Sequence, residues 1–422
     1  MAQGPSLIFD KSSLESLNLD EAVLLDNFYS SVITPIFFVE CLADLEKSIK
    51  SKSTPEQLVG SLADRTPECQ CAVTVHHLDV LRAELAGRFD LRKTLGRPYL
   101  AGGKPVQLGD QKGIIFQESK EEEAMRRWSS REFLEAERQV AKWWRRSLTA
   151  IDFDAMVKAI MGEIGPHLRK PKTLEDARRM TDISIDHMDP EWLLGFGIDL
   201  LGVPEAKDWA LKNWIGRRRP ALRERYPYFI FMLSINIFFC LILPSQLLRN
   251  VKASHHVDLA YLYHLPFCSV FTSKDNFHVQ IVPLFLEKSQ TFVNGNDLKE
   301  DLKRLDERYS ALPDDDFKQG LAHFARFPPD DTSFLTTRLW DRYLPKWRTL
   351  DTHPKLDTQL QKALLEQIKE LTESPELRPH DEHNIEGLSY VSIQRKIHLR
   401  KGKWRRYSEE TERQIIKGEA KK

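Results

Sequence analysis

The sequence predicts an α/β protein in which a strand-and-helix core is interrupted by a long, mainly helical segment. Short strand-like segments end at Asp10 and just before Asp275, and segments with helical spacing alternate with them. The two halves of this pattern lie far apart, because 217 residues separate Glu40 from Asp258. A chain of 422 residues is long enough for two or three domains with a well-buried core.

The N-terminal elements can be read from the spacing of apolar residues. The segment "LIF" (7–9) is typical of a short strand, and "LDEAVLLDNFYSS" has helical spacing before a short extended "VI". The next helix, "TPIFFVECLADLEKSIK", begins with Thr34 as N-cap and Pro35 in the first helical position. Glu40 lies on its otherwise apolar surface, where burying a carboxylate without a partner is costly.

The middle of the chain is rich in charge and tryptophan. Residues 117–148 are expected to form one long helix with acidic residues early and basic residues late, as the helix dipole favours. The segment "KNWIGRRRPALRERY" (212–226) is basic and resembles a linker. Residues 228–243 are almost entirely apolar but shorter than the roughly 20 residues of a membrane span, so we expect a buried core helix.

The second half begins with another helix and strand. "SHHVDLAYLYHLPFC" is a predicted helix with Ser254 as a candidate N-cap, and "CSVFTS" alternates like a strand before Asp275. Beyond residue 300 the chain is helical and polar, and residues 390–407 carry seven Lys or Arg and no acidic residue.

Composition excludes some classes of protein. Sixty-two basic residues balance 62 acidic ones, so any polyanion site must be a local patch. Five scattered cysteines indicate free thiols in a reducing compartment rather than a disulfide framework. The N-terminus shows no secretory signal, so we expect a cytoplasmic protein without a membrane partner.

Four acidic residues stand out by their context: Asp10, Glu40, Asp258 and Asp275. In open α/β sheets, ligands bind at the carboxyl ends of the strands, where Asp10 and Asp275 would lie. Four converging carboxylates raise one another's pKa and need cations, and oxygen ligands suit Mg²⁺ or Mn²⁺. Such a site activates water at a phosphodiester. Taken singly, Asp10 and Asp275 would instead be helix caps or turn formers.

The order and spacing of these residues resemble the PIN-domain nucleases. The matching segments are "LIFD" with Asp10, "ITPIFFVECL" with Glu40, "HVDLAYLYHLPF" with Asp258, and "FTSKD" with Asp275. The resemblance implies a three-layer α/β/α fold with a central, mostly parallel sheet. It also implies cleavage of single-stranded RNA with Mg²⁺ or Mn²⁺ held by the four carboxylates, with Ser273 at the family's small-hydroxyl position. Asp44, one turn after Glu40, is either a supporting residue or alternative ligand, or a solvated side chain.

The chain departs from this family in three respects. Lys11 follows Asp10 where a small polar residue is usual, no second acidic residue follows Asp275, and the Glu40 to Asp258 interval is unusually long. We therefore expect a PIN-like core in two parts, a helical insertion, and a C-terminal helical region with a basic hairpin. The corresponding ranges are 1–55 and 226–300 for the core, 56–225 for the insertion, and 301–422 for the C-terminal region.

Nucleic acid is the expected partner, with RNA favoured over single-stranded DNA. Basic and aromatic residues were assigned to the phosphate backbone and to base stacking: Lys274, Arg395, Lys396, Arg400, Lys401, Lys403, Trp404, Arg405 and Arg406. The alternative for the C-terminal segment is a solvated edge hairpin. A catalytically inactive RNA-binding or interaction protein is the alternative function, and a second copy of the chain or another protein is a further candidate partner.

A second set of residues has metal-ligand chemistry. Cys69, Cys71, His76 and His77 carry zinc-ligand chemistry, but their spacing is not a recurring one. His255 and His256 lie just before Asp258, where they would contact substrate or remain on the surface.

Overall fold

The centre of the protein is a five-stranded parallel sheet with the strand order β3–β2–β1–β6–β7. The computed structural model describes residues 4–47, 53–100, 103–108, 111–150, 158, 162, 170–245, 247–248, 255–350, 390–393 and 395–419. The strands are β1 (Ser6–Phe9), β2 (Ser30–Ile33), β3 (Cys71–Val73), β6 (Val270–Ser273) and β7 (Thr291–Asn294). All four residues of β1, of β2 and of β6 are buried, so helices cover both faces.

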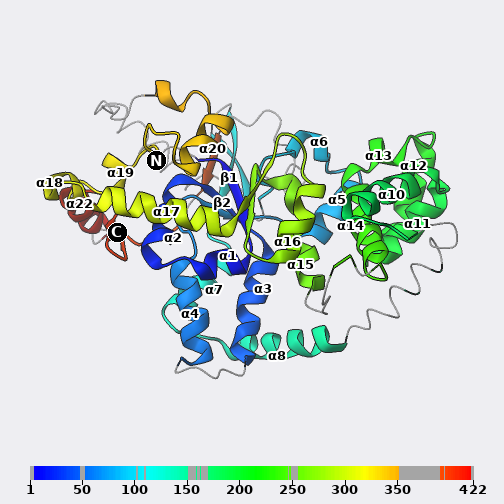
Figure 1. Ribbon diagram of the computed structural model, residues 1–422, viewed down its shortest axis with the longest axis horizontal. Helices are drawn as coiled ribbons and strands as arrows, with labels where there is room; N and C mark the ends of the chain where they lie inside the picture. Colours follow the sequence, from blue (N-terminus) through cyan, green and yellow to red (C-terminus); the bar gives the residue numbers. More distant parts are fainter. Residues whose placement is uncertain are drawn as a thin grey trace.

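This architecture confirms the α/β class with a central parallel sheet. It is compatible with a three-layer α/β/α arrangement, in which helical crossovers connect neighbouring parallel strands. The register pairs Leu7 of β1 with Ser31 of β2 on one side, and Ile8 with Phe271 of β6 on the other. Two strands that are 260 residues apart in sequence are therefore direct neighbours at the middle of the sheet (Figure 1).

The first crossovers follow local capping signals. Asn18 and Glu21 form a capping box at α2, Pro35 begins α3, and Thr54 and Gln57 form a second capping box at α4. The bounds of these elements are α1 (Lys11–Ser16), α2 (Leu19–Phe28), α3 (Pro35–Ala43), the 3₁₀ turn η1 (Asp44–Glu46) and α4 (Pro55–Arg65).

Strand β3 belongs to the central sheet although it lies within the range 56–225 expected for the insertion. It pairs with β2 through Val32 and Ala72, so the chain up to residue 73 belongs to the central sheet. The boundary expected at residue 56 falls inside this part, because a three-residue strand, "CAV", is too short to give a periodic signal. A second sheet, β4–β5–β8, also lies in and beyond the predicted insertion, with strands β4 (Gly103–Leu108), β5 (Gln111–Phe116) and β8 (Tyr390–Ile393).

The charged helix expected over 117–148 is two helices. A turn separates α7 (Lys120–Ser129) from α8 (Glu135–Ala150), and Arg131 adopts a positive φ of 63° there. The amide of Glu132 donates to the carbonyl of Arg127, which closes the end of α7. The other helical elements before β6 are α5 (His77–Leu85), α6 (Leu91–Thr94), α10 (Leu174–His187), α11 (Pro190–Leu200), η3 (Pro204–Ala206), α12 (Lys207–Gly216), α13 (Leu222–Arg225), α14 (Pro227–Ile242), α15 (His255–Leu262) and η4 (Leu265–Phe267).

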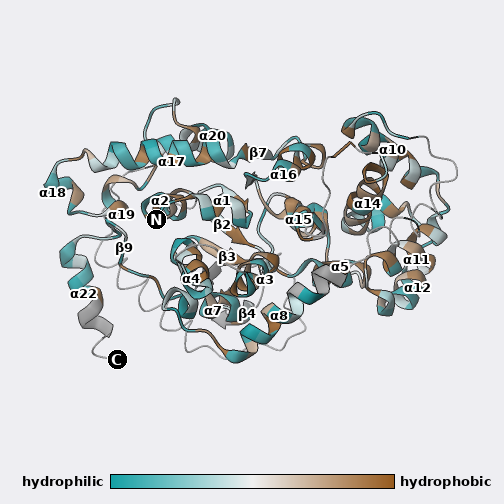
Figure 2. Cartoon of the chain, turned by 60° about the horizontal axis from the view of Figure 1, so that its bottom comes forward, coloured by the Kyte–Doolittle hydropathy of each residue, from teal (hydrophilic) through white to brown (hydrophobic). Residues whose placement is uncertain are grey.

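The apolar segment predicted as a core helix is α14. Its side chains are almost all buried, and α10 packs along it. Figure 2 shows α14 mostly in brown, in contrast to the largely teal outer helix α17 (Gly295–Ser310). Across the described ranges, no helix is both long and apolar enough to cross a membrane.

Near the C-terminal end of the described residues, a basic hairpin precedes the last helix. Strands β9 (Arg400–Lys401) and β10 (Trp404–Arg405) pair antiparallel around Gly402, whose φ of 59° suits a tight turn. The remaining helical elements are α16 (Asn276–Ile281), η5 (Val282–Leu284), α18 (Asp314–Phe317), α19 (Leu321–Phe324), α20 (Leu335–Tyr343), η6 (Trp347–Thr349) and α22 (Glu409–Glu419).

Candidate active site at the carboxyl edge of the sheet

The sheet changes direction between β1 and β6. From β1 the chain proceeds to β2 and β3 on one side, and β6 leads to β7 on the other. The carboxyl ends of two strands at such a switch point border a crevice, which is the usual ligand site of an open α/β sheet. Asp10 directly follows β1, and Ser273 and Asp275 lie at the end of β6.

The Asp10 carboxylate is buried and extensively hydrogen bonded. Its Oδ1 accepts from the Ser13 amide (2.9 Å), and its Oδ2 accepts from the hydroxyls of Ser12 and Ser273 (2.7 Å each). Nδ1 of His278 lies 3.4 Å from Oδ2. Burial alone would raise the pKa of Asp10, but the hydrogen bond and charge of His278, with the two hydroxyls, lower it below its ordinary value.

His278 connects three elements of the site. Its ring is fully buried, Nδ1 lies 2.9 Å from Ser273 Oγ, and Nε2 lies 3.0 Å from the carbonyl oxygen of Asp258. Because a carbonyl oxygen only accepts, Nε2 carries a proton. Burial would lower the pKa of His278, but Asp10 and then Asp258 raise it to about 9. The imidazole is therefore a buried cation at neutral pH.

Glu40 lies on α3 and is tied to α15. The hydroxyl of Tyr261 donates to Glu40 Oε2 over 2.7 Å. Burial raises the pKa of Glu40; the Lys11 ammonium and the Tyr261 hydrogen bond oppose this, whereas Asp10 and Asp44 reinforce it. A carboxyl whose pKa is raised in this way retains its proton to a higher pH than an exposed one.

Asp44 is neutralised by two lysines. Its Oδ2 lies 2.8 Å from Lys11 Nζ, and its Oδ1 lies 2.7 Å from Lys47 Nζ. Burial would lower the pKa of Lys11, but Asp44 and Glu40 raise it above its ordinary value. Lys11, which differs from the expected small polar residue, is thus an internal counterion of the acidic cluster.

The pKa of Asp258 is affected by the other three carboxylates. Burial raises its pKa to about 7; His278 opposes the rise, and the charges of Glu40, Asp275 and Asp10 add to it. Coulombic influence of this kind requires the carboxylates to share one neighbourhood. The four predicted residues therefore lie in one region of the protein, which includes the carboxyl ends of β1 and β6 where Asp10 and Asp275 lie.

Both strand-end aspartates also cap helices. Asp10 is the N-cap of α1, and Asp275 is the N-cap of α16, where its Oδ1 accepts from the Phe277 amide (2.7 Å). The Asp275 amide donates to Ser273 Oγ over 3.0 Å. The capping reading of these residues is therefore correct, and among the hydrogen bonds of the described residues Asp275 accepts through Oδ1.

By its chemistry the donor set suits Mg²⁺ or Mn²⁺, because it consists of carboxylate oxygens. However, the described part of the chain contains no group of three or more His, Cys, Asp or Glu side chains arranged to hold a metal ion. The same statement covers the Cys69, Cys71, His76 and His77 set. In the acidic cluster, the cations of Lys11 and His278 lie among the carboxylates instead.

The basic C-terminal segment is bound to the protein's own carboxylates. Ion pairs hold most of the residues that were assigned to nucleic acid: Arg395 to Glu122 (3.2 Å), Lys401 to Glu68 (2.8 Å), Lys403 to Asp306 (2.7 Å), Arg405 to Glu409 (2.8 Å) and Arg406 to Asp26 (2.7 Å). Trp404 is buried against Phe317 and Phe324, so its ring is not free to stack on a base. Lys396 and Arg400 are exposed, and Lys274 is half-buried next to Asp275.

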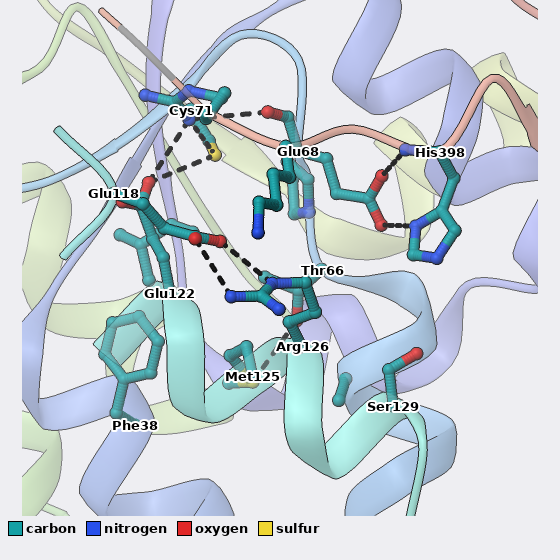
Figure 3. A pocket seen from close by; sticks show the side chains of 15 residues that line it. Phe38, Thr66, Glu68, Cys71, Glu118, Glu122, Met125, Arg126, Ser129 and His398 are labelled. Atoms are coloured by element: carbon teal, nitrogen blue, oxygen red, sulfur yellow. Dashed lines mark hydrogen bonds and ion pairs between the residues drawn. The ribbon is translucent and has the colours of Figure 1, made fainter. Parts of the chain in front are cut away.

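A cavity lies beside this segment. The empty volume of this cavity is about 530 Å³, part of which is open solvent. Arg395, Lys396 and His398 line part of its wall. Figure 3 shows the Glu118–Arg126 and Glu68–His398 pairs facing it, with Phe38 nearby. Its labelled charged groups are already paired within the protein, so the cavity does not indicate the charge of a ligand.

Sequence reasoning did not single out His278 or Tyr261. Each has a signal in the sequence, because His278 lies three residues after Asp275 and Tyr261 lies three residues, almost one helical turn, after Asp258. Comparisons of the chain with models of protein families, with curated proteins and with solved structures found no significant match.

Proposed function

We propose that the chain is a metal-dependent endonuclease of the PIN-like type that hydrolyses RNA. The observation that carries the proposal is the gathering of Asp10, Glu40, Asp258 and Asp275 in one region, which includes the switch point of a parallel sheet. These four were selected from the sequence by their order and context, and they come from four different elements.

In this proposal the four carboxylates hold Mg²⁺ or Mn²⁺. When bound, such a cation activates water and stabilises the attacking and leaving oxygens of a phosphodiester. The chain's own contribution is orientation: Ser12, Ser13 and Ser273 fix the Asp10 carboxylate, and Tyr261 fixes Glu40. Lys396, Arg400 and Lys274 remain the basic residues best placed to meet a phosphate backbone, because the other basic residues assigned to it are paired within the protein.

The PIN-like core would then be the five-stranded sheet with its covering helices. The chain between β3 and α14 would be an insertion that shapes access to the site. Single-stranded RNA is the favoured substrate, and single-stranded DNA is the alternative substrate of the same chemistry.

A catalytically inactive nucleic-acid-binding protein is the second candidate. Lys11 and His278 favour it, because they already neutralise part of the cluster without a metal ion. A cluster balanced by internal cations folds without divalent ions, and it need not bind any.

The deciding experiment is cleavage of end-labelled single-stranded RNA by the full chain, with Mg²⁺, with Mn²⁺ and with EDTA. We expect cleavage that requires the divalent ion and is lost in Asp275→Asn, which keeps the helix cap because asparagine is as good an N-cap as aspartate. Asp297→Asn, in the exposed first turn of α17, is the matched control and should cleave normally.

Cleavage that survives Asp275→Asn would overturn the assignment of the site. RNA binding by a wild-type protein that cleaves under none of these conditions would instead establish the inactive alternative. Repeating the assay with single-stranded DNA separates the two substrates.

A further inference from the structure

The loop that follows α12 carries three consecutive exposed arginines, Arg217, Arg218 and Arg219, and is called the arginine loop below. Together with Lys212, they give residues 212–219 four basic side chains and no acidic one. The proposed function assigns no role to this loop. α11 and α12 pack against each other, and Figure 1 shows them at one end of the molecule, away from the central sheet.

Arg218 and Arg219 both adopt a backbone conformation that favours glycine, with φ angles of 66° and 54°. The turn closes α12 in a Schellman motif. The Arg219 amide donates to the carbonyl of Trp214 (3.1 Å), and the Arg218 amide donates to the carbonyl of Ile215 (2.9 Å). Glycine is the usual residue at the position of Arg218, because a side chain is strained at a positive φ. An arginine there destabilises the turn unless its side chain makes a compensating contact.

The other two described non-glycine residues with a positive φ have such a contact. Arg131 forms an ion pair with Asp64 (2.8 Å), and Arg219 forms one with Glu191 (3.0 Å). Within the described residues, the side chain of Arg218 has no hydrogen bond or ion pair. The strained position therefore presents a guanidinium group to a partner other than these residues.

An exposed aromatic side chain lies beside the arginine loop. The ion pair between Arg219 and Glu191 holds the loop to the first turn of α11. Trp192 follows Glu191 in that turn and is 38% exposed. Its ring stacks on Phe196, with the centroids 4.7 Å apart and the planes inclined by 8°. An aromatic ring that is fixed in place and partly exposed is suited to stacking with an unpaired base.

We propose that the arginine loop and Trp192 together bind single-stranded RNA. Arginine guanidinium groups bind phosphate oxygens in a bidentate manner, and an exposed indole stacks on bases without regard to sequence. Arg217 keeps its charge for this purpose, because its Nε donates to the neutral side chain of Asn213 (3.2 Å). A membrane surface requires a continuous apolar helix face, whereas this end of α12 exposes Ile215 between basic residues.

The choice of RNA as the partner rests on the proposed function. Binding at the arginine loop nevertheless requires neither a metal ion nor cleavage, because phosphate contacts and base stacking supply the affinity. The two proposals can therefore fail separately. The predicted basic hairpin is different in this respect, since most of its basic side chains are paired with carboxylates of the protein itself.

The test is the binding of a fluorescein-labelled oligouridylate to the full-length chain in EDTA, followed by fluorescence anisotropy between about 50 and 200 mM KCl. In the double variant Arg217→Gln with Arg218→Gln, the slope of log Kd against log salt should fall by about 0.7 for each lost phosphate contact. Trp192→Ala should weaken binding about 5- to 150-fold, as for the loss of one stacked base. The matched control, Lys303→Gln on the exposed side of α17, should bind as the wild type does.

Arg218→Gly separates the strain of the turn from the binding of RNA. Glycine adopts a positive φ without strain, so the melting temperature of this variant should be higher than that of the wild type. Its affinity for oligouridylate should nevertheless be lower, because one guanidinium group is missing. A higher melting temperature with unchanged affinity would show that Arg218 takes no part in RNA binding.

Unchanged affinity and salt slope in the double arginine variant would overturn the inference, and RNA cleavage by the same variant at the wild-type rate would leave the proposed function standing. Loop-dependent binding of phosphatidylserine vesicles by a chain that does not bind oligouridylate would also overturn it, in favour of a membrane surface. Loop-dependent RNA binding without cleavage under any metal would support this inference and reject the proposed nuclease. If Trp192→Ala fails to fold, the arginine variants carry the test, because they change exposed side chains.

Discussion

The hydroxyl of Tyr261 donates a hydrogen bond of 2.7 Å to Oε2 of Glu40, across 221 residues of sequence. This contact joins α15 to α3, and it therefore helps to fix the position of the helix that carries Asp258 relative to the helix that carries Glu40. The hydrogen bond also opposes the rise that burial causes in the pKa of Glu40.

We expect Tyr261→Phe to lower the free energy of unfolding by about 1 kcal/mol, because it leaves the half-buried Glu40 carboxyl with one hydrogen-bond partner fewer. Urea unfolding at pH 7 would measure the change. A double-mutant cycle with Glu40→Gln should give a coupling energy of at least about 0.5 kcal/mol, as expected for residues in direct contact. Strictly additive effects would contradict a direct bond.

The raised pKa of Asp258 predicts a stability that falls as pH rises. The folded chain holds this proton up to about pH 7, whereas the unfolded chain releases it near the ordinary value of 3.8. Between these two values the folded state binds more protons, so the free energy of unfolding decreases with rising pH. We expect Asp258→Asn to flatten the profile between about pH 4 and pH 7, in thermal unfolding without divalent ions.

Divalent ions provide the control for this prediction. A cation binds the ionised carboxylates and displaces their protons, so Mn²⁺ should stabilise the wild type more at pH 8 than at pH 5. An equal shift in Tm at both pH values would contradict displacement of a proton from this cluster.

The sequence was most informative where an acidic residue closely follows a predicted strand. Asp10 and Asp275 follow apolar strand-like segments, and the structure places both at the carboxyl edge of the sheet. The spacing within "VDLAYLYHLPFCSVFTSKD" predicted both α15 and β6, because apolar periodicity is the strongest local signal.

The partners of these residues could not be predicted in the same way. Arg406 and Trp404 lie in a run of basic residues, which suggests that their side chains are exposed. In the structure both are buried: Arg406 pairs with Asp26, and Trp404 donates a hydrogen bond to Asp306, both far away in sequence. Strand β3 was missed because three residues carry no periodicity. Such long-range pairings depend on tertiary packing, which local patterns do not encode.

The Arg406–Asp26 pair should be a major anchor of the C-terminal segment. Both side chains are buried, their closest atoms are 2.7 Å apart, and Asp26 also accepts the amides of Cys69 and Gln70. Removing one partner of a buried pair leaves an uncompensated charge, which typically costs about 3–5 kcal/mol. We therefore expect a loss of this size in Arg406→Met, measured by urea unfolding.

The double variant Asp26→Asn with Arg406→Met tests the reason for that loss. It removes both charges, so it should be more stable than Arg406→Met alone. A double variant as unstable as the sum of the two single variants would show that the two charges do not compensate each other.

Glu84 provides a prediction outside the candidate site. Its two carboxyl oxygens accept hydrogen bonds from the amides of Tyr228 and Phe229 (2.8 and 2.7 Å). These amides lie in the first turn of α14, where backbone amides have no acceptor within the helix. Burial raises the pKa of Glu84 to about 8, although these two hydrogen bonds oppose the rise. The folded state therefore binds a proton that the unfolded state releases above its ordinary value of 4.5, and stability contributed by this group declines from about pH 4.5 to pH 8.

We expect Glu84→Gln to remove this decline, because glutamine does not titrate and keeps one oxygen to accept a hydrogen bond. At pH 5 the variant should be less stable than the wild type by about 1–2 kcal/mol, since one helix amide loses its acceptor. The difference should shrink or reverse at pH 8, where the wild type must bury a charge. Thermal unfolding of both proteins over this range measures the crossing, and parallel pH profiles would show that Glu84 is ionised throughout.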